Sequence, residues 1–175
     1  MSIELFILRL VVGALFVGHG TQKLFGWFGG HGPEGTGRFF ESIGYAPGGQ
    51  MARVAGVSEA GSGALLILGF LTPLACAAII GVMVGTLAVH LPKGLWNTNG
   101  GYELPLVYAA CAAALAYAGP GRASIDAAHG WTVSGVVVGT GAVVFGALTG
   151  GVMLAIRSAH VQRAGQQQQQ PRRAA

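Results

Sequence analysis

Five apolar stretches run along the chain, separated by short polar or glycine-rich segments. Their approximate bounds are 5–23, 51–71, 74–91, 102–119 and 131–156. Each is close to the roughly 20 residues that a helix needs to cross a bilayer. The stretches are continuously apolar and lack the alternating pattern of membrane β-strands. The pattern therefore predicts an all-α fold, a polytopic membrane helix bundle.

Composition also indicates a membrane protein. Hydrophobic residues make up 52% of the 175-residue chain and charged residues only 9%, whereas a soluble domain has roughly 25% charged residues. Five spans leave no room for an appended soluble catalytic domain, so any chemistry must take place in or on the membrane. Four of the ten basic residues follow the last apolar stretch, where basic residues are expected to be a topology signal. The net charge of +4 is therefore not taken to indicate a nucleic-acid partner.

Basic residues predict the orientation of the bundle. Counting spans from the N-terminus places segments 24–50 and 92–101 and the C-terminal tail on one side, and that side carries most of the lysines and arginines. The positive-inside rule makes this side cytoplasmic and leaves the N-terminus outside. Segment 38–45 is amphipathic and is expected to lie on the membrane surface. The glutamine-rich segment 157–175 is expected to be a disordered cytoplasmic tail.

Ionisable and polar side chains from four predicted helices gather in the cytoplasmic half, when sequence position is converted into depth at about 1.5 Å per helical residue. The candidate catalytic residues are Glu59, Lys23, His90 and Glu103, and the candidate ligand-binding residues are His19, Trp27, Trp96, Asn99 and Tyr102. Charges in hydrocarbon normally face the bundle interior and pair, and they mark ligand paths, proton relays or ion sites. We therefore predict a polar intramembrane site centred on Glu59.

Structural explanations of the same residues stay open. Lys23 could extend to the interface, Glu103 and Asn99 could cap the fourth span, and the aromatic residues could form an interfacial belt. Glu59 could form a structural ion pair with Lys23 or His19. These hypotheses differ in whether the polar groups face a cleft.

A second polar group is predicted at the opposite end of the bundle. Arg9 lies there, and its expected carboxylate partner is Asp126 in the loop between the last two spans. That loop has the sequence Gly119-Pro120-Gly121-Arg122-Ala123-Ser124-Ile125-Asp126. Alternatively, the loop is a turn and helix cap that anchors Arg9.

The run Gly-Pro-Gly-Arg-x-Ser-x-Asp at 119–126 resembles the signature that closes the core of DoxX-type membrane proteins. Other residues follow the order of the family's landmarks: Arg9, Gly20 with Lys23-Leu24, Phe39-Phe40 with Gly44, Glu59 with Gly61, and His90 before Gly101-x-Glu103. The resemblance implies a four-helix transmembrane core over residues 1–130, with 131–156 as an additional helix. It also implies a bacterial plasma-membrane protein.

DoxX-type proteins are described as oxidoreductase or quinone-reductase subunits, including a subunit of thiosulfate:quinone oxidoreductase. The resemblance therefore implies quinone as ligand and soluble redox or sulfur-transfer enzymes as partners. A quinone dissolves in membrane lipid and needs an apolar cleft with a few polar groups. In such a site Lys23 or His90 would hydrogen-bond a quinone carbonyl, and Glu59 or Glu103 would move protons.

The sequence contains no dinucleotide-binding glycine motif, no iron–sulfur cysteine cluster and no covalent haem motif. No metal or flavin site is predicted, so electrons would come from a partner, within a homo- or hetero-oligomer. Two other functions stay open. One is a small permease in which Glu59, Lys23 and Arg9 gate one pathway. The other is a noncatalytic membrane anchor or assembly factor for soluble redox enzymes.

Overall fold

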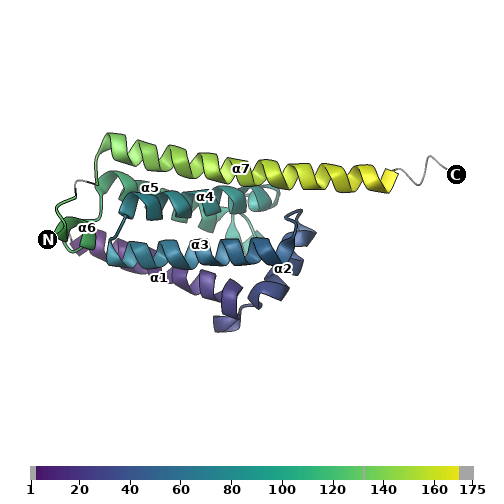
Figure 1. Cartoon of the computed structure of the whole chain (residues 1–175), viewed down its shortest axis with the longest axis horizontal. Coiled ribbons are helices and arrows are strands. Elements are labelled where there is room, and N and C mark those ends of the chain that lie inside the picture. Colours follow the sequence, from purple (N-terminus) through teal and green to yellow (C-terminus); the bar gives the residue numbers. More distant parts are fainter. Residues whose placement is uncertain (1–2, 132, 170–175) are drawn as a thin grey trace.

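The computed structural model describes residues 3–131 and 133–169, and it is helical throughout its regular structure. The longer helices are α1 (Ile3–Phe25), α2 (Gly32–Ser42), α3 (Gly48–Leu68), α4 (Thr72–His90), α5 (Glu103–Ala118) and α7 (Val136–Gln169), as Figure 1 shows. The short elements are η1 (Trp27–Gly29), η2 (Leu91–Lys93), η3 (Asn97–Asn99) and α6 (Ile125–Ala128). The predicted all-α membrane bundle is confirmed.

Among the described residues, four helices are long and apolar enough to cross a membrane: α1, α3, α4 with its η2 extension, and α7. The fourth predicted span is the shorter helix α5, with 16 residues. At about 1.5 Å per residue this helix is roughly 24 Å long, somewhat less than the roughly 30 Å hydrocarbon core. Five apolar helices are therefore present, as predicted, but one of them falls short of full spanning length.

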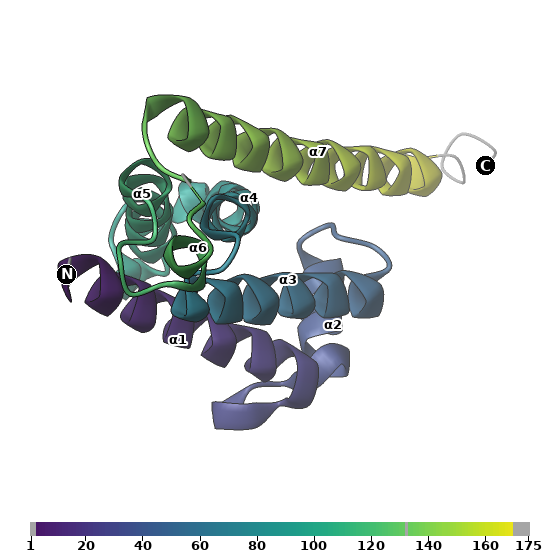
Figure 2. The ribbon, with the colours of Figure 1, turned by 60° about the vertical axis from the view of Figure 1, so that its left-hand side comes forward.

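Small residues set the packing of α1 against α3. A Cβ atom on Gly13 would lie 2.7 Å from the carbonyl oxygen of Gly63, so the two backbones are almost in contact there. Such close approach is how membrane helices associate without a hydrophobic drive between them. Figure 2 shows α4 between the α1–α3 pair on one side and α7 on the other. The buried core includes Phe16, Leu66, Ile79 and Leu115.

Helix α7 differs from the prediction at both ends. It begins at Val136 rather than at 131, and it continues as one 34-residue helix to Gln169, a length of about 51 Å. The prediction that the tail is disordered from 157 is therefore wrong as far as Gln169, and its remainder lies outside the described residues. Glutamine, alanine and arginine are adequate helix formers.

A contact with the α2–α3 loop also favours the extended helix. The Nε atom of Arg157 donates a hydrogen bond of 2.6 Å to the carbonyl oxygen of Ile43. The guanidinium lies 5.8 Å from the ring centroid of Tyr45. The helical extension of α7 thus holds the loop that joins α2 to α3.

Candidate functional site

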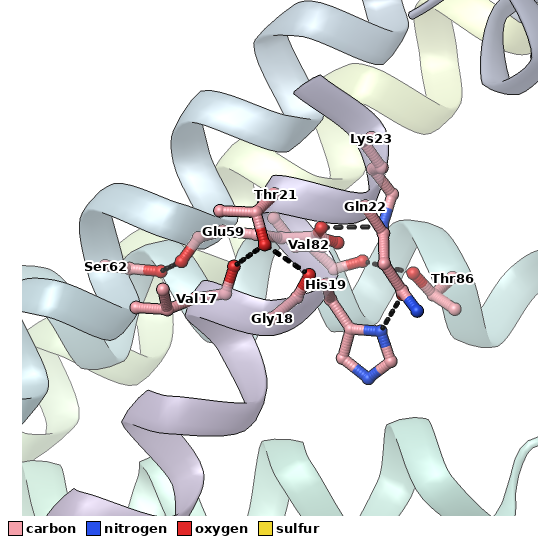
Figure 3. Close-up of polar contacts among 10 residues, drawn as sticks. All are labelled: Val17, Gly18, His19, Thr21, Gln22, Lys23, Glu59, Ser62, Val82 and Thr86. Atoms are coloured by element: carbon pink, nitrogen blue, oxygen red, sulfur yellow. Dashed lines mark hydrogen bonds and ion pairs between the residues drawn. The ribbon is translucent and has the colours of Figure 1, made fainter. Parts of the chain in front are cut away.

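Lys23 and Glu59 form an ion pair inside the bundle, drawn in Figure 3. The Nζ atom of Lys23, near the C-terminal end of α1, lies 2.6 Å from Oε2 of Glu59 on α3. The Glu59 side chain is only 6% exposed, and that of Lys23 is 22% exposed. The close packing of α1 on α3 positions both residues, since Gly20 and Gly56 let the helix backbones meet one turn away from the pair. Lys23 and His19 were the two partners expected for Glu59, and the structure shows the ion pair with Lys23.

The ion pair faces a large cavity. The cavity has a volume of about 610 Å³, and His19, Lys23, Glu59 and His90 are all among its lining residues. Its walls are otherwise mostly apolar and come from α1, α2, α3, α4, α5 and α7 and the segments between them. Four of the nine residues predicted for catalysis or ligand binding therefore surround one space. We call this group, together with the cavity, the Lys23 cluster.

The two histidines of the Lys23 cluster are held differently. The Nδ1 atom of His90 lies 2.6 Å from the carbonyl oxygen of Gly100. A carbonyl can only accept, so Nδ1 carries a proton and Nε2 stays available to accept, or to donate when the ring is protonated. His19 is exposed, and its Nδ1 lies 3.2 Å from the amide oxygen of Gln22. His90 is thus fixed at one edge, whereas His19 links the cavity to the exterior.

Several cavity residues were missed by the sequence reasoning. Tyr108 on α5 lies with its ring edge-on to Phe16, at a centroid distance of 5.3 Å, and to His19, at 6.3 Å. Its hydroxyl makes no hydrogen bond to any other described residue. Ser58 and Thr86 also line the cavity. Thr86 lies one helical turn before His90, so the 3.6-residue period of α4 could have indicated it.

Five of the predicted residues do not line the cavity. These are Trp27, Trp96, Asn99, Tyr102 and Glu103. Both tryptophans are largely exposed. The Oε2 atom of Glu103 accepts a hydrogen bond of 2.9 Å from the backbone nitrogen of Asn97 and so orders the loop before α5. The structure therefore assigns Glu103 a local structural contact, and its proton-transfer role stays a prediction.

At the opposite end of the bundle, Arg9 and Asp126 do not line the cavity of the Lys23 cluster. Arg9 and Asp126 are fully buried, but the ion pairs of the described residues do not include them. Arg9 instead donates through Nη2 to the carbonyl oxygen of Ala123, and its guanidinium lies 5.8 Å from the ring centroid of Phe6. Asp126 is thus the carboxylate that interacts with the Arg9 charge, as expected, but the two residues form no direct ion pair, because the Asp126 carboxylate bonds to backbone amides.

Asp126 fastens the turn between α3 and α4. Its two carboxylate oxygens accept hydrogen bonds from the backbone nitrogens of Leu71 (2.8 Å) and Thr72 (2.9 Å). Its own backbone nitrogen donates to the carbonyl oxygen of Gly69. Leu71 has a left-handed φ of 48°, which is strained for a leucine, and the bonded carboxylate stabilises it. The alternative of a turn and cap is the one that the geometry supports; we call these residues the Asp126 fastener.

Comparison with known protein families identifies the family of the chain. The DoxX family model matches residues 4–91, half of the chain. The chain belongs to the DoxX family. The match includes Arg9, His19, Lys23, Glu59 and His90 and ends before α5 and α7. No curated protein and no solved structure matches the chain. Family membership and the four apolar helices long enough to span a bilayer make the chain an integral membrane protein.

Proposed function

We propose that this protein is the integral membrane subunit of a quinone-linked oxidoreductase system, and that the Lys23 cluster binds the quinone head group. The observation that carries the proposal is the buried Lys23–Glu59 pair opening onto one cavity with His90. A purely structural ion pair would not need a cavity beside it. A charged pair that faces a ligand-sized space inside a membrane bundle favours a ligand or proton site.

The residues present fit such a head group. A volume of about 610 Å³ is ordinary for small-molecule sites, which are mostly apolar with a few convergent polar groups. A dicarbonyl ring needs hydrogen-bond donors at its two oxygens. The Lys23 ammonium has three donors and uses one on Glu59, and the Tyr108 hydroxyl and the His90 ring are further polar groups from other helices at the same cavity.

When bound, a quinone would supply two-electron, two-proton carrier chemistry, and the chain's own residues would manage the protons. On reduction the quinone oxygens would take up two protons; Lys23 could donate one of them, and a protonated Glu59 could then return a proton to Lys23 across their 2.6 Å contact. Exposed His19 lies at the cavity wall and would connect the cavity to water outside the bundle. Since the sequence holds no redox motif, electrons would come from a soluble redox or sulfur-transfer partner. We propose in addition that the protein lies in a bacterial plasma membrane with its N-terminus outside and its C-terminus cytoplasmic, as the positive-inside rule predicts.

Quinone binding by the purified protein in lipid nanodiscs tests the proposal. We expect saturable binding of menaquinone that weakens about tenfold in Glu59→Gln, since a charge-assisted contact is lost at the site. The matched control is Glu34→Gln on α2, which is exposed and outside the cavity, and it should bind like the parent. Absence of saturable binding in the folded parent protein would contradict the proposal.

The permease hypothesis predicts a different geometry and result. It needs Arg9 as a second gate of the pathway, but Arg9 does not line the cavity and is bonded to the Ala123 carbonyl. Proteoliposome flux that disappears in Glu59→Gln, without quinone binding, would favour a carrier. Retention of all partner-dependent activity in the same folded variant would favour the membrane-anchor hypothesis.

A further inference from the structure

The loop between α2 and α3 forms the wall at one end of the cavity. Phe39 and Phe40 near the end of α2, and Ile43 and Tyr45 in the loop, all line the cavity. The loop leads directly into α3, and α4 runs antiparallel to α3, so these side chains lie at the same end as His90, the last residue of α4. In the proposed topology this is the cytoplasmic end. We call residues 43–47, which connect the two helices, the strap.

The strap bridges a gap between α3 and α7. Both helices line the cavity, but α7 packs mainly on α4 and α5. Figures 1 and 2 show the loop between α2 and α3 reaching from the end of α3 towards α7. Among the described residues, Met153 is the last α7 residue on the cavity wall, and Arg157, which contacts the strap, lies one helical turn further on. The strap therefore crosses from α3 to α7 at the very end of the cavity.

The strap has one face towards the cavity and one towards the surroundings. The Tyr45 side chain is buried, and its hydroxyl lies 3.4 Å from the position that a Cβ atom on Gly85 of α4 would take. The Phe40 ring lies beside it, at a centroid distance of 5.8 Å. Glu41 and Ser42, which precede the strap, are exposed. Tyr45 therefore fills the space between the strap and α4 and separates the cavity from the exterior there.

Two residues of the helical extension of α7 hold the strap in place. The Nε atom of Arg157 donates to the carbonyl oxygen of Ile43 at 2.6 Å, and the guanidinium lies 5.8 Å from the ring centroid of Tyr45. A Cβ atom on Gly44 would lie 2.5 Å from Cγ2 of Val161, so this valine packs directly on the strap backbone. Both contacts come from positions one and two helical turns beyond the cavity wall. We call Arg157 and Val161 the latch.

The latch is the main attachment of the strap outside its neighbouring helices. The backbone nitrogens of Ile43, Gly44 and Tyr45 all donate to carbonyl oxygens of α2, so these bonds lie within one local unit. Among the described residues, the bond from Arg157 is the one hydrogen bond that joins the strap to a helix other than α2 or α3. A segment held by so few bonds opens more readily than a helix does. Release of the latch would therefore free the strap while α2 and α3 stay folded.

We propose that the strap is a lid on this end of the cavity, and that the latch on α7 keeps the lid closed. With the latch engaged, Tyr45 separates the cavity from water at this end; with the latch released, water and small solutes reach the cavity through the gap between α3 and α7. The DoxX match ends at residue 91, so the latch lies in the part of the chain beyond it. The inference concerns access to the cavity and does not depend on which ligand binds there.

Thiol labelling in lipid nanodiscs tests the lid. Thr86→Cys places a thiol on the cavity wall with little change in side-chain size, and a water-soluble methanethiosulfonate reagent measures its access to water. Adding Arg157→Ala should raise the labelling rate about fivefold, the change in open population that corresponds to the loss of about one hydrogen bond. The matched control Arg163→Ala removes the same charge from an exposed position of α7 outside the cavity. It should leave the rate unchanged.

A milder variant and an internal control separate lid opening from general loosening. Val161→Ala removes two methyl groups at a half-exposed position and should raise the labelling rate about twofold. Cys76 is fully buried and does not line the cavity, so its own labelling reports unfolding of the bundle. If Cys76 is labelled faster to the same extent as the thiol at position 86, the effect is global and the lid is wrong.

The remaining outcomes separate the lid from the proposed function. Equal labelling rates in the parent, Arg157→Ala and Val161→Ala proteins would overturn the lid, whether or not menaquinone binds. A faster rate in both latch variants, with Cys76 and the Arg163→Ala control unchanged, would support the lid even if menaquinone does not bind. Quinone binding therefore tests the proposed function by itself, and thiol labelling tests the lid by itself.

Discussion

The Lys23 cluster and the polar group around Arg9 and Asp126 are similar in composition but differ in what their charged side chains contact. Each contains a basic and an acidic residue that are wholly or largely buried, contributed by sequence-distant segments. At the end with the Asp126 fastener and the neighbouring Arg9, both charged groups bond to backbone atoms, Asp126 to two amides and Arg9 to a carbonyl. In the Lys23 cluster the charged side chains bond to each other and face a cavity. Of the two groups, the Lys23 cluster is the one whose charged side chains line a ligand-sized cavity.

The largest effect on stability is expected from Asp126→Ala. This substitution removes two charge-assisted hydrogen bonds, leaves the Thr72 amide without its acceptor and releases the strained Leu71 turn. We expect a loss of about 3 kcal/mol of unfolding free energy, measured by thermal unfolding in detergent. Quinone affinity of the folded fraction should not change. A loss below that of Glu34→Ala, an exposed carboxylate control, would contradict the fastener.

The next largest effect separates the two members of the ion pair. Lys23→Met leaves the Glu59 carboxylate buried without its partner, and we expect a loss of about 2 kcal/mol. Adding Glu59→Gln should restore at least part of this stability, because the uncompensated charge is then removed. Unfolding of the single and double variants measures the coupling. Simple additivity of the two losses would show that the pair contributes no interaction energy.

A smaller effect concerns the extension of α7, which neither polar group includes. Arg157→Ala removes the hydrogen bond to Ile43 and the stacking on Tyr45, together worth about 1 kcal/mol. Burial raises the pKa of Tyr45 and the nearby Arg157 opposes that shift, so the stacked ring stays neutral at physiological pH. Hydrogen exchange of the amides of 43–45 should become faster. Arg163→Ala, on an exposed face of the same helix, should leave it unchanged.

The smallest effect is expected at Glu103. Its hydrogen bond to the Asn97 amide is partly exposed, so Glu103→Gln should cost about 0.5 kcal/mol. Because Glu103 does not line the cavity, quinone affinity should match that of the parent. A clear loss of affinity in a folded Glu103→Gln protein would instead support the proton-transfer role predicted from sequence, and would extend the Lys23 cluster to the N-terminus of α5.

Much of the fold could be predicted from the sequence, for a physical reason. Long apolar stretches have no stable alternative to helices in lipid, because every backbone polar group must bond within the chain. A charged side chain inside the membrane is also costly unless it is paired. An ion pair between Lys23 and Glu59 could therefore be predicted as one of the structural alternatives. The helical rise fixes how deep each residue lies. Depth along the helices was therefore enough to predict that Glu59, Lys23, His19 and His90 lie in the same half of the bundle.

Only the tertiary structure decided what each polar residue faces. The rotation of a helix about its axis depends on packing against its neighbours, and here glycines such as Gly13 and Gly63 set that packing. On α4 and α5, the packing directs Thr86 and Tyr108 towards the cavity and leaves Glu103 outside it, and Trp96 lies outside it in the segment before α5. Composition alone could not place the tail either, since a contact with Ile43 helps to keep α7 helical beyond 157. The sequence determined which polar groups need bonding partners inside the membrane. The three-dimensional packing determined which partners they have, because it sets what each side chain faces.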